Sequence, residues 1–175
     1  GSFVDFVLDD SGNPVILMNA MSMHTMNIRE ASEQDRGRKM VTLFAQLAGQ
    51  SGGQDVSRCS ITGTIEQIPS SSEDIAQIRL RYSITHAYAD QVMDSPKFAF
   101  YRLTPAKIYY VGGFGVQSQW VPVDEYQNAR PDVLARYAAD IVQKLNRDSE
   151  EDLTLVAVHL LETPNIEEIK VTSVD

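Results

Sequence analysis

Four side chains between residues 38 and 62 have the chemistry to hold a phosphate group: two arginines, a lysine and a threonine. They are Arg38, Lys39, Arg58 and Thr62. Each flanks or lies on a stretch that we expect to be a β-strand, and all four groups donate hydrogen bonds that phosphate oxygens accept. Exposed charges on the rim of a sheet explain the same residues equally well, so both interpretations stay open.

Three histidines are the candidate metal ligands of the chain: His24, His86 and His159. His24 lies where a helix is expected to begin, and His86 is expected to pack or cap between two helices. His159 falls on the apolar stripe of the last expected helix, a position typical of a core histidine. None has a second ligand at the spacing of zinc sites, so the pattern predicts no zinc site.

Nucleophilic catalysis is not indicated by the sequence. No serine lies in a nucleophile elbow, and Cys59 has no evident histidine partner. Cys59 falls in an alternating stretch and is expected to be a small buried strand residue. The run Gly112-Gly113-Phe114-Gly115 precedes neither a Lys-Ser/Thr pair nor a helix, so it is not a phosphate loop. It is expected to let a strand bend or bulge.

Composition narrows the class of protein further. The 175 residues carry a formal net charge of -9, which disfavours nucleic-acid binding and favours basic surfaces of partner proteins. The single cysteine excludes an intrachain disulfide and fits a reducing compartment. No apolar run is long enough to span a bilayer, and no targeting peptide is visible.

Local patterns predict strands first and helices later. A turn signal at residues 10–14 between two apolar runs predicts a hairpin. The expected strands are residues 3–9, 15–18, 38–47, 58–68, 98–103 and 107–111, with Thr104-Pro105-Ala106 as the last connection and extended structure again at 119–121. The expected helices are residues 24–32, one that begins within 69–74, 87–93, 130–145 and 148–161, before a strand-like stretch at 166–174. This order predicts an α+β fold.

Residues 98–115, which read FAFYRLTPAKIYYVGGFG, and the following Trp120 resemble the barrel of the HugZ-type haem oxygenases. Members of that family share a run F-x-x-Y-R-L and a strand that ends V-G-G-F-G. Residues 23–28 are similar to the family's L-x-x-H-T-x-N-L segment, and His86 matches a histidine ahead of the helix that leads into the first run. Arg102, Gly112, Gly113, Phe114 and Gly115 are therefore interpreted as a structural motif.

The resemblance covers nearly the whole chain and implies its fold. It implies a six-stranded split β-barrel of the pyridoxamine-phosphate-oxidase type, an FMN-binding split-barrel-like fold, at residues 1–122. The beginning of a small, incomplete C-terminal α/β domain would follow at residues 123–175. There the family has the motif H-M-N-x-D-H, whereas this sequence keeps Asn146 and Asp148 but has Lys144 and Ser149 at the histidine positions.

The plant glutamyl-tRNA reductase-binding proteins are the branch that the chain resembles best. The resemblance implies a regulator of haem and chlorophyll synthesis in the plastid stroma, a homodimer that binds glutamyl-tRNA reductase. No catalytic residue, metal, nucleic acid, membrane span or cofactor is expected under this interpretation. The alternative is a HugZ-type haem-degrading oxygenase or an FMN-dependent oxidoreductase, with His24, Arg58 and Thr62 as cofactor-binding residues. The expected contributors to the dimer are Phe98, Phe100, Tyr109 and Trp120.

Overall fold

The structure, a computed structural model, describes residues 1–34, 40–46, 56–112, 117–130, 133–161 and 169–171. The chain forms two compact units, residues 1–128 and residues 129–175. The first unit includes a short helix, α3 (Val123–Asn128), which follows the last strand. It therefore extends beyond residue 122, where the sequence places the end of the first domain.

The first unit begins with a hairpin of β1 (Phe6–Leu8) and β2 (Pro14–Asn19), as the turn signal predicts. The side chain of Asp9 closes the turn, because its Oδ1 accepts hydrogen bonds from the backbone N–H groups of Ser11 and Asn13, both at 2.9 Å. Gly12 has a φ of 77°, a left-handed conformation that glycine adopts without strain. Hydrogen bonds within the turn and the conformation of Gly12 thus favour this connection.

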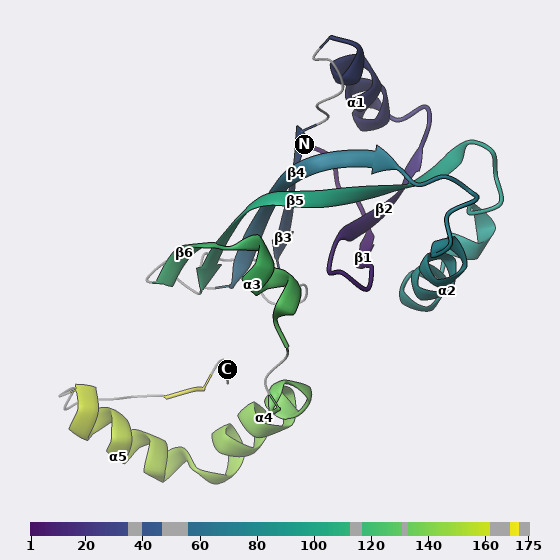
Figure 1. The fold of residues 1–175 in the computed structure, drawn as a ribbon. Helices are drawn as coiled ribbons and strands as arrows, with labels where there is room; N and C mark the ends of the chain where they lie inside the picture. Colours follow the sequence, from purple (N-terminus) through teal and green to yellow (C-terminus); the bar gives the residue numbers. More distant parts are fainter. Residues whose placement is uncertain (35–39, 47–55, 113–116, 131–132, 162–168, 172–175) are drawn as a thin grey trace. The chain divides into compact units, whose positions relative to one another are not determined.

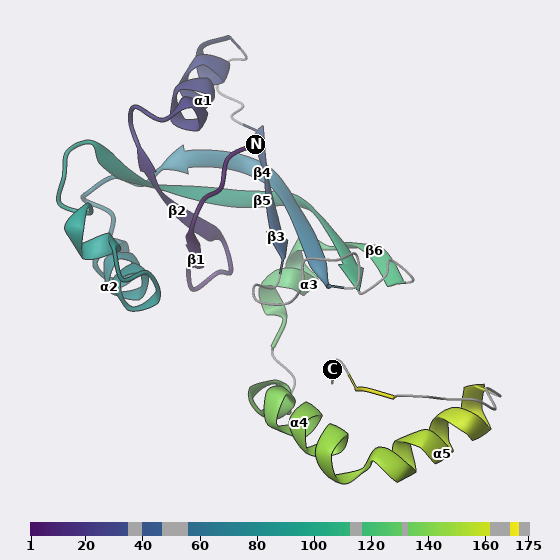
Figure 2. The same cartoon turned by 180° about the vertical axis from the view of Figure 1, so that it is seen from behind.

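Six antiparallel strands form one sheet in the order β1-β2-β5-β4-β3, and β6 pairs with β5. The remaining strands are β3 (Met40–Gln46), β4 (Arg58–Gln67), β5 (Phe98–Gly112) and β6 (Gln117–Val121). One edge of β5 pairs with β4, and the other edge pairs first with β2 and then with β6. Figures 1 and 2 show β4 and β5 side by side, with β1 and β2 near one end of the pair and β6 at the other. This arrangement confirms the α+β split-barrel fold.

β5 is a single strand, so the expected connection at Thr104-Pro105-Ala106 is wrong. Gly63 pairs with Pro105 and Thr62 pairs with Lys107, which leaves Ala106 as an extra residue on β5. The strand therefore contains a β-bulge. A proline, which lacks a backbone N–H, is tolerated at a bulge because the ladder is already interrupted there.

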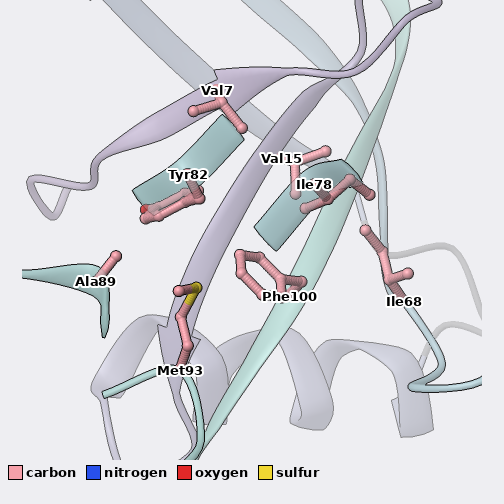
Figure 3. Close-up of a cluster of buried hydrophobic side chains, with 8 residues drawn as sticks. All are labelled: Val7, Val15, Ile68, Ile78, Tyr82, Ala89, Met93 and Phe100. Atoms are coloured by element: carbon pink, nitrogen blue, oxygen red, sulfur yellow. The ribbon is translucent and has the colours of Figure 1, made fainter. Parts of the chain in front are cut away.

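Apolar side chains fill both sides of the first half of β5. Inside the barrel, Leu103 of this half packs with Ile108 of the second half and Ile61 of β4 in one buried cluster. On the opposite side of the sheet, α2 (Ile75–Thr85) packs its buried Tyr82 against Phe100. Figure 3 shows this second cluster, which consists of Val7, Val15, Ile68, Ile78, Tyr82, Ala89, Met93 and Phe100. Phe100 is only 5% exposed, so it is not available to a second copy of the chain, contrary to the expectation from sequence.

The helices of the first unit differ from expectation at their ends. α1 (Met23–Gln34) confirms the helix expected at 24–32. α2 begins at Ile75 because residues 70–74 form turns, in which Ser72 Oγ donates to Asp74 Oδ1 at 2.5 Å. A single 3-10 turn at Ala89–Gln91 (η1) takes the place of the helix expected at 87–93.

The second unit contains a 3-10 turn at Ala135–Tyr137 (η2) and two helices, α4 (Ala138–Asp148) and α5 (Glu150–Leu161). Ala157 is the only buried residue among those that the structure describes in this unit. His159 is exposed on α5, so its expected place in a core is wrong. The strand expected at 166–174 lies mostly outside the described residues, and residues 169–171 form no strand. Within the described ranges, no helix combines the length and apolar character needed to cross a membrane.

Candidate ligand-binding face

The strands β3 to β6 turn alternate residues away from the barrel interior. In β4, Ile61 and Ile65 are buried inside the barrel, while the half-buried Ser60 and Thr62 point to the opposite side. Because side chains alternate along a strand, Arg58 shares this side with Ser60 and Thr62. We call this side of β3, β4, the second half of β5 and β6 the outer face.

An aromatic row crosses the outer face from strand to strand. The register pairs Phe44 of β3 with Ser60 of β4, Ser60 with Tyr109 of β5, and Tyr109 with Trp120 of β6. Phe44 is 57% exposed and Trp120 is 68% exposed. The rings of Tyr109 and Trp120 have centroids 4.9 Å apart and are tilted by 47°. The row is about 14 Å wide from the spacing of neighbouring strands, and it presents aromatic surface to solvent.

Each neighbouring row contributes one cation. Arg58 lies in the row of Gln46, Val111 and Ser118, and the exposed Lys107 lies opposite Thr62 on the other side of the aromatic row. Residues two apart on a strand are about 6.6–6.8 Å apart, so a cation stands beside the row on each side.

The outer face also has a shallow depression and a hydroxyl pair. The depression has a volume of about 370 Å³ and is lined by Phe44, Arg58, Cys59, Ser60, Tyr109, Val111 and Ser118. The hydroxyls of Thr42 and Thr62 are hydrogen-bonded to each other at 2.8 Å. Aromatic rings stack on flat ligands, and cations and hydroxyls bind anionic groups. This combination suits a planar ligand that carries carboxylates or phosphates.

Cys59 does not add a ligand for a metal to this depression. Its side chain packs against the interior cluster of Leu43, Ile61, Leu103 and Ile108. Burial raises the pKa of the Cys59 thiol, which keeps it protonated at neutral pH. The sequence predicts a buried strand residue, whereas Cys59 lies on β4 and is half-buried.

His24 and His86 lie elsewhere, in a groove beside the edge strand β3. The groove has a volume of about 1060 Å³ and is lined mainly by residues 1–6, one side of α1 and residues 41–46. His24 Nε2 is 3.0 Å from Ser22 Oγ, and His86 Nε2 is 3.1 Å from the carbonyl oxygen of Phe6. No lysine or arginine is among the described residues that line the groove, and the phosphate candidates Arg38 and Lys39 lie outside the described residues.

Arg102 connects three segments of the first unit and has a structural role. Its guanidinium forms ion pairs with Asp74, ahead of α2, and with Asp9 in the hairpin turn. The Nε of Arg102 is 2.8 Å from Asp9 Oδ2 but makes no hydrogen bond of acceptable angle, so that contact is Coulombic. The hydrogen bond from Ser72, with the charge and hydrogen bond of Arg102, holds the pKa of Asp74 below its usual value.

Asn146 also has a structural role in the second unit. Its side-chain amide donates to the carbonyl oxygen of Val171 at 2.9 Å and accepts from the backbone N–H of Val171 at 2.8 Å. Asp148 pairs with the neighbouring Arg147. The two positions at which this chain keeps the pattern H-M-N-x-D-H therefore make contacts that need neither of the replaced histidines.

The structure separates the cofactor-binding residues expected from sequence. Arg58 and Thr62 share the outer face, whereas His24 lines the groove. Gly112 ends β5, and Gly113, Phe114 and Gly115 lie outside the described residues. Sequence reasoning did not single out Phe44 or Lys107, which share the outer face, and assigned Tyr109 and Trp120 to a dimer contact alone. The alternation of residues 40–46 and 58–65 could have placed Phe44 beside Ser60, but only with the strand register.

A six-stranded split barrel with one open sheet face defines the class of this protein. The chain belongs to the CREG β-barrel family, whose description matches residues 2–128. The resemblance to HugZ-type split barrels, which residues 98–115 suggest, is confirmed by this match and by the solved structures of similar fold.

Two curated relatives, both from Arabidopsis thaliana, are similar to most of this chain. The non-canonical heme oxygenase HOZ, chloroplastic, is 29% identical over 167 residues, which cover 94% of this chain and 48% of the relative. The chloroplastic glutamyl-tRNA reductase-binding protein is 26% identical over 153 residues, which cover 87% of this chain and 42% of the relative. The chain thus spans less than half the length of either relative.

Solved structures extend the similarity to bacterial proteins. A heme binding protein from Mycobacterium smegmatis is 25% identical, with a TM-score of 0.69, and the match covers 99% of this chain and 68% of that one. HutZ, a heme storage protein from Vibrio cholerae, is 15% identical, with a TM-score of 0.53 over 65% of this chain and 78% of HutZ. The likeness to HutZ supports the fold alone.

Proposed function

We propose that the first unit binds haem on its outer face. The observation that carries the proposal is the exposed aromatic row of Phe44, Tyr109 and Trp120, with Arg58 on one side and Lys107 on the other. Haem is a flat ring with two carboxylates, so the ring would stack on the row and the carboxylates would pair with the cations. The names of HOZ and of the Mycobacterium smegmatis protein support haem among planar anionic ligands.

This mode of binding does not depend on an iron ligand from the outer face. Of the three histidines, His24 and His86 line the groove and His159 lies in the second unit. Bound haem would bring a redox-active iron, whereas the residues of the outer face orient the ring and neutralise its carboxylates. Stacking and charge pairing hold the ligand, so the proposal is a haem-binding rather than a haem-degrading role.

A titration with haem and with iron-free protoporphyrin tests the proposal directly. Both ligands should bind with similar affinity if the ring and carboxylates are what the protein recognises. The double variant Arg58→Ala/Lys107→Ala should weaken both by about tenfold, since an exposed charge contact contributes ~0.5–1 kcal/mol. Lys97→Ala, which removes an exposed lysine just before β5, is the matched control and should bind like the wild type.

The opposite result would assign the ligand to the groove. If haem binds, protoporphyrin does not, and His24→Ala abolishes haem binding while Arg58→Ala/Lys107→Ala has no effect, the outer-face proposal is wrong. Titration with FMN in the same assay tests the flavin alternative, because Arg58 and Thr62 are the groups that would hold its phosphate.

Binding of glutamyl-tRNA reductase is the second candidate function. It is favoured by the similarity to the chloroplastic glutamyl-tRNA reductase-binding protein over 87% of this chain. The net charge of -9 suits a partner with a basic surface and predicts faster association at low salt. A pull-down of purified reductase tests it, and capture that is independent of haem would make it the principal function. No retention at low salt would remove it.

A homodimer in the plastid stroma completes the proposal. Both curated relatives are chloroplastic, which supports a plastid location. In the absence of haem, a symmetric second copy would cover the apolar surface of the exposed Phe44 and Trp120. Light scattering with and without haem tests the dimer, and a monomer under both conditions would exclude it. Fractionation of plastids that contain the full-length protein tests the stroma.

A further inference from the structure

The β-bulge in β5 changes which residues of that strand face outward. Before the bulge, Tyr101, Leu103 and Pro105 are buried, and after it Ile108 is buried. The positions that face the barrel interior are therefore odd-numbered before Ala106 and even-numbered after it. Because side chains alternate along a regular strand, the accommodation of one extra residue accounts for this change.

Without the bulge, the residues after Ala106 would face the wrong way. A regular ladder through Ala106 would place Lys107 and Tyr109 inside the barrel and turn Ile108 to the outer face. With the bulge, Lys107 lies opposite Thr62 and Tyr109 lies opposite Ser60, next to Trp120. Two of the residues that form the proposed haem site owe their position to this one irregularity.

Gly63 is the residue on β4 that leaves room for the bulge. A Cβ at this position would lie 1.9 Å from the carbonyl oxygen of Thr104, 2.7 Å from its carbonyl carbon and 3.0 Å from the Cα of Pro105. All three atoms belong to the backbone, so no side-chain rotation could relieve the overlap. Any larger residue at 63 must displace β5 at the bulge.

We infer that Gly63 and the bulged Ala106 act together as a positioning device that places Lys107 and Tyr109 on the outer face. For its effect on ligand binding, the inference rests on the proposed function. The contact between Tyr109 and Trp120 gives a second readout that needs no ligand. Trp120 is the only tryptophan of the chain, so the tryptophan fluorescence and the tryptophan band in near-ultraviolet circular dichroism come from this residue and respond to its contact with Tyr109.

Three variants of the full chain test the device: Gly63→Ala, deletion of Ala106, and both changes together. Deletion of Ala106 should remove the bulge and still leave Lys107 and Tyr109 facing outward, because the next residue takes its place in the alternation. Gly63→Ala should remove the near-ultraviolet circular dichroism that Trp120 gains from its contact with Tyr109, change the fluorescence of Trp120, and weaken protoporphyrin binding by about tenfold. The combined variant should restore both, since a regular ladder has space for a Cβ at position 63.

Rescue by the deletion separates positioning from a general structural role. If the combined variant is as impaired as Gly63→Ala in the Trp120 signal, the inference is overturned. Should Gly63→Ala fail to fold, a combined variant that folds with a wild-type Trp120 signal supports the inference, and one that stays unfolded overturns it. If the wild type binds no tetrapyrrole, the proposed function fails, while the Trp120 signal still decides the inference.

Discussion

Both halves of β5 pair with a neighbouring strand on each edge, but only the first half is covered by other side chains on both of its faces. In the first half, Phe100 packs under α2 while Tyr101 and Leu103 face the barrel interior, so both faces of the strand are covered. In the second half, Ile108 is buried on one side, whereas Lys107 and Tyr109 stand on the bare outer face. Substitutions should therefore change stability in the first half and binding in the second.

Phe100 lies in the covered first half of β5 and Phe44 of β3 lies on the bare outer face, and this pair gives the largest expected contrast in stability. Phe100→Ala should lower the free energy of unfolding by about 3–5 kcal/mol, because it leaves a cavity beside Tyr82. Phe44→Ala should change it by about 0.5 kcal/mol or less, because Phe44 is 57% exposed. Chemical denaturation of both variants measures the difference. Equal losses of stability would contradict the distinction between the covered first half of β5 and the bare outer face.

Arg102 is the charged residue in the covered half of β5, and its substitution should have an intermediate effect on the free energy of unfolding. Arg102→Met leaves Asp9 and Asp74 without their common partner, which should cost about 1–2 kcal/mol at neutral pH, since the pairs are partly exposed. The pKa of Asp74 is lowered by the hydrogen bond of Ser72 and by Arg102. This contribution is therefore present above the usual pKa of 3.8 and is lost as the pH falls below it.

Denaturation curves at several pH values check that dependence. The stability difference between the wild type and Arg102→Met should be constant near neutrality and shrink below about pH 3.8. Arg79→Met, which removes an exposed ion pair with Asp94, is the matched control and should show a smaller difference at every pH. A gap that widens in acid would rule out the ion-pair explanation.

Trp120 of β6 lies beside the second half of β5 on the outer face, and its substitution should affect ligand binding more than stability. Trp120→Ser removes the stacking partner of Tyr109, which should weaken haem and protoporphyrin by about fivefold to tenfold. The free energy of unfolding should change by less than about 1 kcal/mol, because the side chain is 68% exposed. A large loss of stability with unchanged affinity would show that the aromatic row supports the fold instead.

The strands that surround the covered half of β5 were largely predictable from sequence, because the residue patterns that indicate them are local. The turn residues at 10–14 predict the hairpin, and alternation in residues 58–68 predicts β4. Pro105 misled the prediction, since a proline near the middle of an apolar run usually ends a strand. The β-bulge that tolerates it is a property of the pairing between β4 and β5, which no single segment reveals.

The arrangement of side chains on the outer face depends on the register of four strands and was not predictable from local patterns. Phe44, Ser60, Tyr109 and Trp120 are far apart in sequence and meet only because three ladders align them. The same limit applies to glycine. The sequence predicts a bend or bulge at the glycine-rich run that begins at Gly112. Among the described glycines, however, Gly63 is the one at which a Cβ would clash with backbone atoms. His24 was likewise chosen for its chemistry, and the fold places it in the groove.

Thr62 offers the smallest effect and distinguishes the two ligand classes proposed for the bare half. Thr62→Val keeps the shape of the side chain but removes the hydroxyl that is 2.8 Å from Thr42 Oγ1. Stability should change by about 0.5 kcal/mol or less, since the pair is exposed to water. A stacked tetrapyrrole uses the rings and the two cations, so its affinity should change by less than about twofold. A phosphate held by this hydroxyl would instead lose a hydrogen bond to a charged group, about 1.5–3 kcal/mol or more than tenfold in affinity.

Titrations of Thr62→Val with protoporphyrin and FMN, with Thr104→Val as the control for an exposed threonine on β5, measure both values. Loss of FMN binding in Thr62→Val, together with a wild type that binds no protoporphyrin, would assign the outer face to a phosphate-bearing cofactor and contradict the haem proposal.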